Sequence, residues 1–196
     1  MPSSPHQLVL ASSSPRRKEL LTEAGYSFTI VLPDDSVEDP IHREESVREY
    51  VARLAFQKAK SVIPKIESGL VLACDTLAYC EGELLGKPTD QDEARRMVTH
   101  LSGKEHQVYS GLCLWDKTTG QKNVEVETSI LSMKPLSPKE LDDYLATDLW
   151  VGKAGAFGYQ DGHPWLTLTS GSPSNVVGLP LERLKAMLSS FIEATL

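Results

Sequence analysis

The stretch that decides the fold class is residues 8–25, LVLASSSPRRKELLTEAG. It opens with four apolar residues bounded by turn residues, a pattern typical of a short buried strand. Ser14 suits a helix N-cap, Pro15 suits the first helical position, and Gly25 suits the left-handed position after the last turn. The stretch therefore predicts a strand, a turn and a helix, with Arg16 and Arg17 at the helix N-terminus.

Further alternation of strand and helix patterns follows along the chain. We expect a strand near 28–31, a helix over 43–62, a strand over 70–80, a helix capped by Thr89 or Asp90, a hairpin of 106–116 and 123–133, a helix from 138, a glycine-rich loop at 152–162, a strand at 165–171 and a helix over 180–194. This order predicts the α/β class, as a single domain over residues 1–196 with a central mixed β-sheet flanked by helices.

Composition limits the classes of partner. The chain has 196 residues, 40% of them hydrophobic, and a formal net charge of -7. An acidic chain has no overall attraction for a nucleic acid polymer or a membrane surface, so a phosphate-bearing ligand must be held by a local basic cluster. No signal-peptide pattern or 18-residue apolar run is present, and we expect a cytoplasmic protein that binds a small molecule.

The cysteines and histidines carry no metal-binding pattern. Cys74, Cys80 and Cys113 form no CxxC pair, so we expect small buried side chains. The five histidines form no HExxH spacing, and we expect them on the surface or without a functional role.

Three charged residues stand where apolar or constrained positions are expected. Lys58 lies four residues after Leu54 on the apolar stripe of its helix, where it either faces the core or extends to water. Asp75 interrupts a nearly continuous apolar run, where a carboxylate needs a partner unless it caps a local turn. Lys87 stands between a glycine and a proline in a tight loop, where the alternative is an exposed loop lysine.

Together with Arg16 and Arg17, these residues supply four cations and one acid. A helix N-terminus and arginine forks bind phosphate oxygens, and lysines add point charge. An aspartate can hold Mg²⁺ or accept a proton from an attacking water. Neither the Walker A nor the GxGxxG pattern is present, so the residues alone indicate only an α/β domain with a phosphate-ligand site.

Several motifs, in order along the chain, resemble the Maf family of nucleoside triphosphate pyrophosphatases. They are LASSSPRRKELL, ESVREYVARLAFQKA, CDT, LGKP, LSGKEHQVYSG, GKAGAFGYQ and NVVGLPL. The resemblance implies a homodimeric α/β fold related to the ITP pyrophosphatases, with the nucleotide in a cleft crossing the sheet. It also implies hydrolysis of a nucleoside triphosphate to the monophosphate and pyrophosphate, with Mg²⁺ or Mn²⁺ as the divalent cation.

The resemblance also assigns roles to individual residues. The family's catalytic acid-base residue, which is also a metal ligand, matches Asp75. Its phosphate-binding positions match Ser12, Arg17, Lys58 and Lys87. Its acidic metal-binding position after the second strand matches Glu38 best, with Asp35 or Asp39 as alternatives.

Three positions separate branches of the family. Arg16, Thr76 and Gln160 match the branch that acts on dTTP and UTP. The branch that acts on 7-methyl-GTP carries Trp, Gln and Glu instead, which suits a cationic base. This chain departs from the family pattern at Asp161, where glycine is usual, and at Pro173, where an aromatic residue is frequent.

The leading hypothesis is therefore a dTTP/UTP pyrophosphatase that removes modified nucleotides or contributes to cell-division arrest. One alternative is the same chemistry on another base, such as CTP, 7-methyl-GTP or a modified pyrimidine. A second alternative is a non-catalytic nucleotide-binding regulator of septum formation, although a regulator has little use for a costly buried acid.

Overall fold

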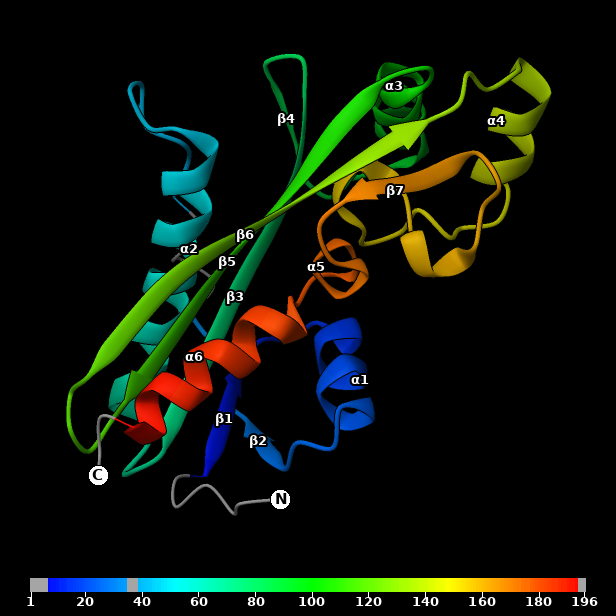
Figure 1. The fold of residues 1–196 in the computed structure, drawn as a ribbon. Helices are drawn as coiled ribbons and strands as arrows, with labels where there is room; N and C mark the ends of the chain where they lie inside the picture. The colour runs from blue at the N-terminus through cyan, green and yellow to red at the C-terminus, as the bar shows by residue number, and fades with distance from the viewer. Residues whose placement is uncertain (1–6, 35–38, 194–196) are drawn as a thin grey trace. The chain divides into compact units, whose positions relative to one another are not determined.

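A computed structural model describes residues 7–34 and 39–193. Its described residues form a mixed seven-stranded sheet in the order β2-β1-β3-β5-β6-β7, with β4 paired to β3 (Figure 1). The strands are β1 (Leu8–Ala11), β2 (Phe28–Ile30), β3 (Leu70–Cys80), β4 (Glu83–Leu85), β5 (Glu105–Asp116), β6 (Lys122–Met133) and β7 (Leu166–Ser170). The pairs β1–β2 and β1–β3 are parallel, and β3–β4 and β6–β7 are antiparallel. The predicted α/β class with a mixed sheet is confirmed.

The helices follow the predicted order. They are α1 (Pro15–Glu23), α2 (Val47–Val62), α3 (Gln91–Leu101), α4 (Pro138–Leu145), α5 (Pro173–Val177) and α6 (Leu181–Glu193). Short 3-10 turns are η2 (Ile63–Lys65), η3 (Ala154–Ala156) and η4 (Tyr159–Asp161). Within the described ranges, no helix combines the length and apolar character needed to cross a membrane.

The chain groups into two compact units. The first unit comprises Met1–Asp75, Ser110–Glu127 and Gly178–Leu196, and the second comprises Thr76–Tyr109 and Thr128–Val177. Strands β3, β5 and β6 contribute residues to both units. The assignment of residues 1–196 to one domain stays a prediction.

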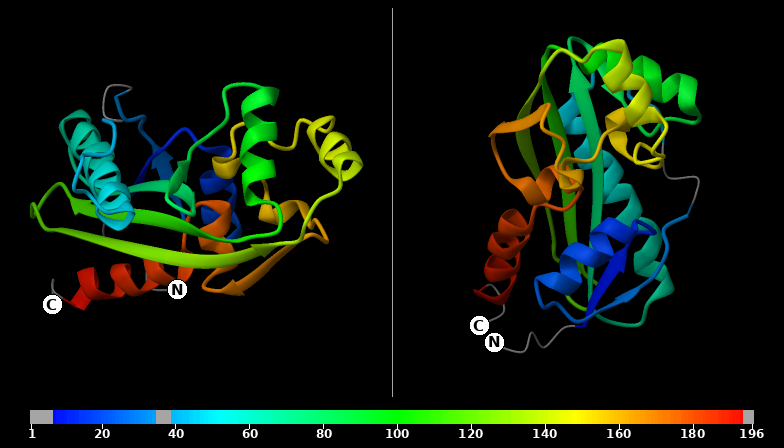
Figure 2. Two further views of the ribbon diagram at one scale, coloured as in Figure 1. Left: turned by 90° about the horizontal axis from the view of Figure 1, so that it is seen from above. Right: turned by 90° about the vertical axis from the view of Figure 1, so that its right-hand side faces the viewer.

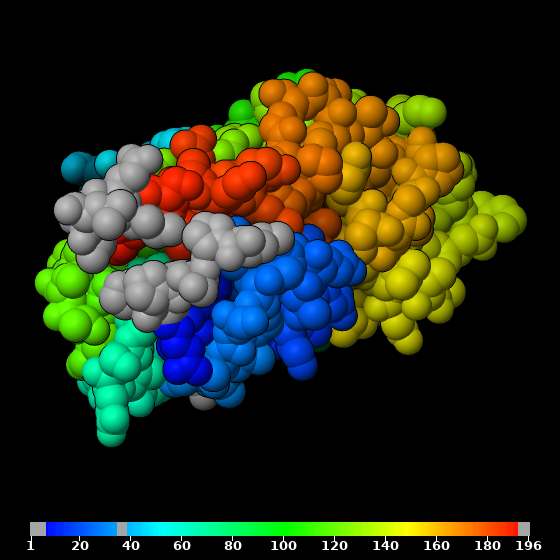
Figure 3. All heavy atoms as spheres, turned by 60° about the horizontal axis from the view of Figure 1, so that its bottom comes forward, coloured from blue at the N-terminus to red at the C-terminus, as the bar shows by residue number. Residues whose placement is uncertain are grey.

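The first unit has a helix layer on each face of its strands. Alternate strand residues enter two separate buried clusters, because successive side chains point to opposite faces. Leu8, Leu10 and Leu72 pack with residues of α1 and α6, whereas Val9 and Val71 pack with residues of α2. Figure 2 shows α6 and α2 on opposite sides of these strands. In Figure 3, α1 and β2 form the blue part of the exposed surface.

Helix α2 begins later than predicted, and its cap explains the difference. Ser46 Oγ accepts a hydrogen bond from the Glu49 N–H at 3.2 Å, and the Glu49 carboxylate accepts one from the Ser46 N–H at 2.8 Å. This capping box satisfies two helix-end donors and fixes the first helical residue at Val47 rather than near Arg43.

The second unit is built around α3 and α4. Asp90 caps α3, and the predicted capping box of Ser137 and Glu140 starts α4. Apolar residues of both helices pack with residues from the ends of β3, β5 and β6 in one buried cluster. The sequence interpretation missed β4 and α5, because three and five residues are too few for a periodic pattern.

The cysteine prediction is confirmed, and the histidine prediction is partly wrong. All three cysteines are buried and free, and burial raises the pKa of the Cys113 thiol to about 12. His106, however, is buried against Phe157, with 5.1 Å between ring centroids in an edge-to-face contact. Burial lowers the pKa of this histidine to about 4.

Candidate active site

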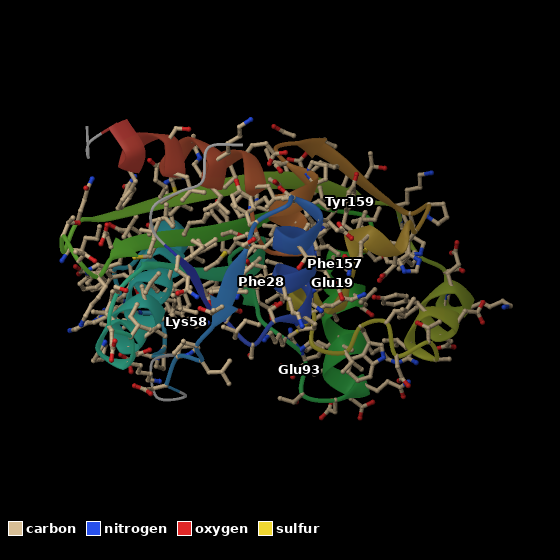
Figure 4. All side chains as sticks on the ribbon, turned by 90° about the horizontal axis from the view of Figure 1, so that it is seen from below. Glu19, Phe28, Lys58, Glu93, Phe157 and Tyr159 are labelled. Atoms are coloured by element: carbon tan, nitrogen blue, oxygen red, sulfur yellow. The ribbon has the colours of Figure 1, made fainter. Side chains whose placement is uncertain are left out.

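Lys58 and Asp75 form a buried ion pair in the first unit. Lys58 Nζ donates a hydrogen bond to Asp75 Oδ1, and the two residues are only 8% and 7% exposed. Figure 4 shows Lys58 on α2, and Asp75 lies within β3. The alternatives of a lysine extended to water and of an aspartate that caps a turn are therefore wrong. A buried carboxylate needs a cation, and here α2 supplies it.

A close approach of α2 to β5 positions this pair. A Cβ atom on Gly111 of β5 would lie far closer than 3.0 Å to the carbonyl oxygen of Val51, so only glycine fits there. Lys58 follows Val51 by seven residues, or two helical turns, and lies on the same face of α2. The packing of α2 on the sheet thus directs the lysine inward.

Ser12 and Arg17 are joined at the start of α1. The buried Ser12 Oγ accepts hydrogen bonds from the Ser14 N–H at 3.2 Å and from Arg17 Nη1 at 3.1 Å. Arg17 Nε donates to the carbonyl oxygen of Gly178 at 2.8 Å. Ser14 occupies the N-cap position but makes no side-chain capping bond. The serine turn and the guanidinium therefore form one polar group at a helix N-terminus, a favourable place for an anion.

Arg16 and the remaining predicted residues are placed as follows. Arg16 is half-buried in the first turn of α1. Thr76 follows Asp75 on β3 and is half-buried, and it belongs to the second unit. Lys87 and Gln160, also in the second unit, are both exposed, the first in the loop before α3 and the second in η4.

The loops that carry Lys87 and Gln160 are connected within the second unit. The N–H of Gly155 donates to the carbonyl oxygen of Gly86 at 2.9 Å, which ties the glycine-rich loop to the residue before Lys87. A Cβ on Gly155 would lie against the Phe157 ring and Ala78, so the loop packs closely at this point. The structure thereby brings together two segments that the sequence places about seventy residues apart.

A second buried ion pair, Lys153–Asp161, lies in the same loop and was missed by sequence reasoning. Lys153 Nζ and Asp161 Oδ2 are 2.5 Å apart, and each side chain is 11% exposed. The departure from the family pattern at Asp161 was the available signal. The partner could not be inferred, because a separation of eight residues in an irregular loop follows no periodic rule.

Only some of the expected metal-binding residues belong to the part of the chain that the structure describes. Glu38 and its alternative Asp35 lie outside the described residues. Asp39, the other alternative, is exposed and its Oδ2 accepts a hydrogen bond from Gln57 Nε2 at 3.2 Å. In ranges 7–34 and 39–193, no group of three or more His, Cys, Asp or Glu residues could hold an ion. Asp75 nevertheless offers the oxygen donor that Mg²⁺ and Mn²⁺ prefer, and Mg²⁺ commonly uses one or two carboxylates with water and phosphate oxygens.

Comparison with known proteins agrees with the motifs. Residues 7–191 match the family model described as Maf-like protein. A dTTP/UTP pyrophosphatase of Rhodopirellula baltica is 48% identical over 95% of this chain and 83% of its own length. A dTTP/UTP pyrophosphatase of Vibrio vulnificus is 40% identical over 95% of this chain and 100% of its own length. The solved structure of a HAM1 protein from Coxiella burnetii is 14% identical, with a TM-score of 0.49 over 94% of this chain and 99% of that one. Because the family model and relatives above 30% identity cover nearly all of it, the chain belongs to the Maf family.

Proposed function

We propose that this chain is a nucleoside triphosphate pyrophosphatase that hydrolyses dTTP and UTP to the monophosphate and inorganic pyrophosphate. The observation that carries the proposal is the buried Lys58–Asp75 pair, a costly arrangement that a purely structural strand does not need. Relatives named dTTP/UTP pyrophosphatase, at 38–48% identity over more than 90% of the chain, support the choice of reaction and substrate.

In the proposed reaction, a water molecule attacks the α-phosphorus and the Asp75 carboxylate accepts its proton. The bond between the α-phosphorus and the bridging oxygen breaks, and pyrophosphate leaves with that oxygen and the electron pair. A positioned general base of this kind contributes about 10²- to 10⁴-fold to the rate. Ser12, Arg17 and the lysines stabilise the negative charge that develops on the leaving group.

Lys58 can serve both Asp75 and the substrate. Its ammonium group donates a hydrogen bond to Asp75 Oδ1 and carries a positive charge that attracts a nearby phosphate group. We propose that Lys58 orients Asp75 and contacts the triphosphate, and that Lys87 contacts the phosphates from the loop before α3.

The proposed reaction also uses a divalent cation. We propose Asp75 and Glu38 as the residues that hold Mg²⁺ or Mn²⁺, since carboxylate oxygens are the donors these ions prefer. When bound, the cation neutralises phosphate charge and makes the attacking water more acidic.

Base selection is proposed for Arg16, Thr76 and Gln160. A cationic arginine and a neutral glutamine disfavour the positively charged base of 7-methyl-GTP, whereas they can offer hydrogen bonds to the carbonyl groups of thymine and uracil. We further propose a cytoplasmic homodimer that removes modified nucleotides or acts in cell-division arrest. Light scattering after gel filtration tests the dimer.

The decisive test is a pyrophosphate-release screen. Canonical and modified triphosphates, including CTP and 7-methyl-GTP, are compared at equal concentration with Mg²⁺ and with Mn²⁺. We expect dTTP and UTP to give the highest kcat/KM. Preference for another base would replace the substrate assignment, and tight nucleotide binding without pyrophosphate release would favour the regulator of septum formation.

A further inference from the structure

The Lys153–Asp161 ion pair closes the loop that presents Gln160. Lys153 precedes η3, and Asp161 is the last residue of η4, immediately after Gln160. Both charged side chains are 11% exposed, whereas Gln160 itself is exposed to solvent. A largely buried ion pair is therefore directly linked, through the chain, to a solvent-exposed amide side chain.

The two ends of this loop differ in how they are held. At the Lys153 end, the Tyr144 hydroxyl donates to the carbonyl oxygen of Ala156 at 2.9 Å, and the Gly155 N–H bonds to Gly86 at the same distance. At the Gln160 end, the turn bonds are long, with 3.4 Å for Asp161 N–H to Gly158 and 3.3 Å for Gly162 N–H to Tyr159. The ion pair ties the weakly bonded turn to the firmly bonded segment.

Gly158 shows how closely the chain is fitted to this pair. A Cβ atom there would lie well under 3.0 Å from both Asp161 Oδ2 and Lys153 Nζ. Yet the backbone of Gly158 is ordinary extended chain, with φ -122° and ψ 119°, which any residue adopts. The absence of a side chain at Gly158 therefore leaves room for the ion pair, and a larger residue there would have to displace the two charged groups.

The surroundings of Asp161 explain why it needs Lys153. His163 lies beside it, with His163 Nε2 3.9 Å from Asp161 Oδ2, and the Tyr144 ring packs edge-to-face on His163. The pKa of Tyr144 is raised, first by burial and then by the negative charge of Asp161. A carboxylate in this poorly solvated position is stable only with a cation beside it.

We infer that the Lys153–Asp161 pair is a positioning device for base recognition, which holds η4 so that the Gln160 amide meets the base of the nucleotide. This inference rests on the proposed function, because it assumes that Gln160 contacts the base. Neither Lys153 nor Asp161 is assigned to the phosphates. The pair therefore acts on selectivity between bases, and the hydrolytic step stays with Asp75.

Two variants disrupt the pair in different ways. Lys153→Met with Asp161→Asn removes both charges and leaves no unpaired charge behind, so folding should be retained. Gly158→Ala keeps both charges and separates them with a methyl group. In each variant we expect KM for dTTP to rise about tenfold while kcat stays within about threefold. We expect dCTP turnover to change little, so the dTTP:dCTP ratio of kcat/KM falls about tenfold.

A matched control is the exposed Lys139–Asp143 pair of the same unit, whose side chains are 83% and 63% exposed. Lys139→Met with Asp143→Asn should leave the base ratio unchanged. An unchanged ratio in both loop variants, or an equal fall for every triphosphate, would overturn the inference. A thermal melt accompanies each variant, to distinguish a loosened loop from a misfolded protein.

Calorimetric binding of dTTP and dCTP separates this inference from the proposed function. If the unmodified chain binds dTTP without releasing pyrophosphate, the proposed function fails. In that case the preference for dTTP over dCTP in binding, taken as the ratio of their Kd values, is compared between the loop variants and the unmodified chain. A preference reduced about tenfold in the variants supports the inference, and an unchanged preference overturns it.

Discussion

The two buried lysine–aspartate pairs are nearly identical in composition and burial, and they differ in where their partners come from. Lys58 and Asp75 are 10% exposed at their side chains and join a helix to a strand across 17 residues of sequence. Lys153 and Asp161 are 11% exposed and close a single irregular loop across eight residues. The first pair lies in the first unit and the second pair in the second.

The comparison shows that a buried ion pair has no single meaning. Removing charges from water costs several kcal/mol per ion, and mutual attraction offsets that cost only when the geometry is good. Burial alone is thus weak evidence for a stabilising role. The neighbouring residues distinguish the two pairs: Asp75 lies in the unit that also holds Ser12 and Arg17, whereas Asp161 belongs to the same turn as Gln160.

The largest expected effect is that of Asp75→Asn. The amide cannot accept the proton of the attacking water, so kcat for pyrophosphate release should fall by about 10²- to 10⁴-fold on every triphosphate. The amide oxygen still accepts a hydrogen bond from Lys58, so the fold should remain, but at a lower free energy of unfolding because the buried lysine loses its counter-charge. Single-turnover kinetics and circular dichroism measure the two quantities.

Asp161→Asn is the counterpart that sharpens the contrast. It should lower the dTTP:dCTP ratio of kcat/KM, while kcat for dTTP remains within about threefold of the unmodified chain. Should Asp75→Asn retain the turnover of the unmodified chain, the two pairs would not differ in the way described, and Asp75 would lose its assigned role.

A third expected effect concerns His106, which packs edge-to-face against Phe157 of the loop closed by the Lys153–Asp161 pair. Burial lowers its pKa to about 4 from the ordinary value of 6.5. The unfolded chain therefore takes up a proton below pH 6.5 that the folded chain does not. The free energy of unfolding therefore keeps the full contribution of the neutral His106 above pH 6.5. It decreases by about 3 kcal/mol in total as the pH falls from 6.5 to about 4.

Urea unfolding at several pH values tests this effect. His106→Leu should flatten the dependence of unfolding free energy on pH between 6.5 and 4. The control is His42→Gln, at an exposed position of the first unit. A slope that is the same in His106→Leu and the unmodified chain would show that other groups cause the acid sensitivity.

Gly111→Ala tests whether the close packing of α2 on β5 positions the Lys58–Asp75 pair. The added methyl group meets the Val51 carbonyl and pushes α2 away from β5. We expect a loss of about 1–3 kcal/mol in unfolding free energy, typical of an overpacked core. Lys58 should also move from Asp75, so kcat should fall. Full activity at reduced stability would show that the seating of α2 does not position Lys58.

The smallest effects are expected at the helix caps. Ser46→Ala and Ser137→Ala each remove a capping box, and each should cost about 1 kcal/mol of unfolding free energy. Ser14→Ala should cost much less, because the Ser14 side chain makes no capping bond. Equal losses at all three positions in chemical denaturation would contradict the assignment of Ser14 as a cap in position only.

Much of the fold could be predicted because its signals are local. The Ser137 capping box, Pro15 at the first helical position and the left-handed Gly25 all appear in the structure as expected. The elements that were missed or shifted, β4, α5 and the start of α2, are short or depend on one cap. Local chemistry therefore predicts long elements better than short ones.

In the candidate site, too, local features could be predicted from the sequence and contacts between distant segments could not. The sequence by itself determined that Lys58 and Asp75 violate the apolar pattern and that a buried acid needs a cation, because periodicity and the cost of burying charge are properties of the local chain. Only the tertiary structure decided that each is the other's partner, that Gly111 seats the helix which brings them together, and that Lys153 pairs with Asp161. These contacts depend on packing between segments distant in sequence or on the path of an irregular loop, and neither leaves a repeat that spacing can reveal.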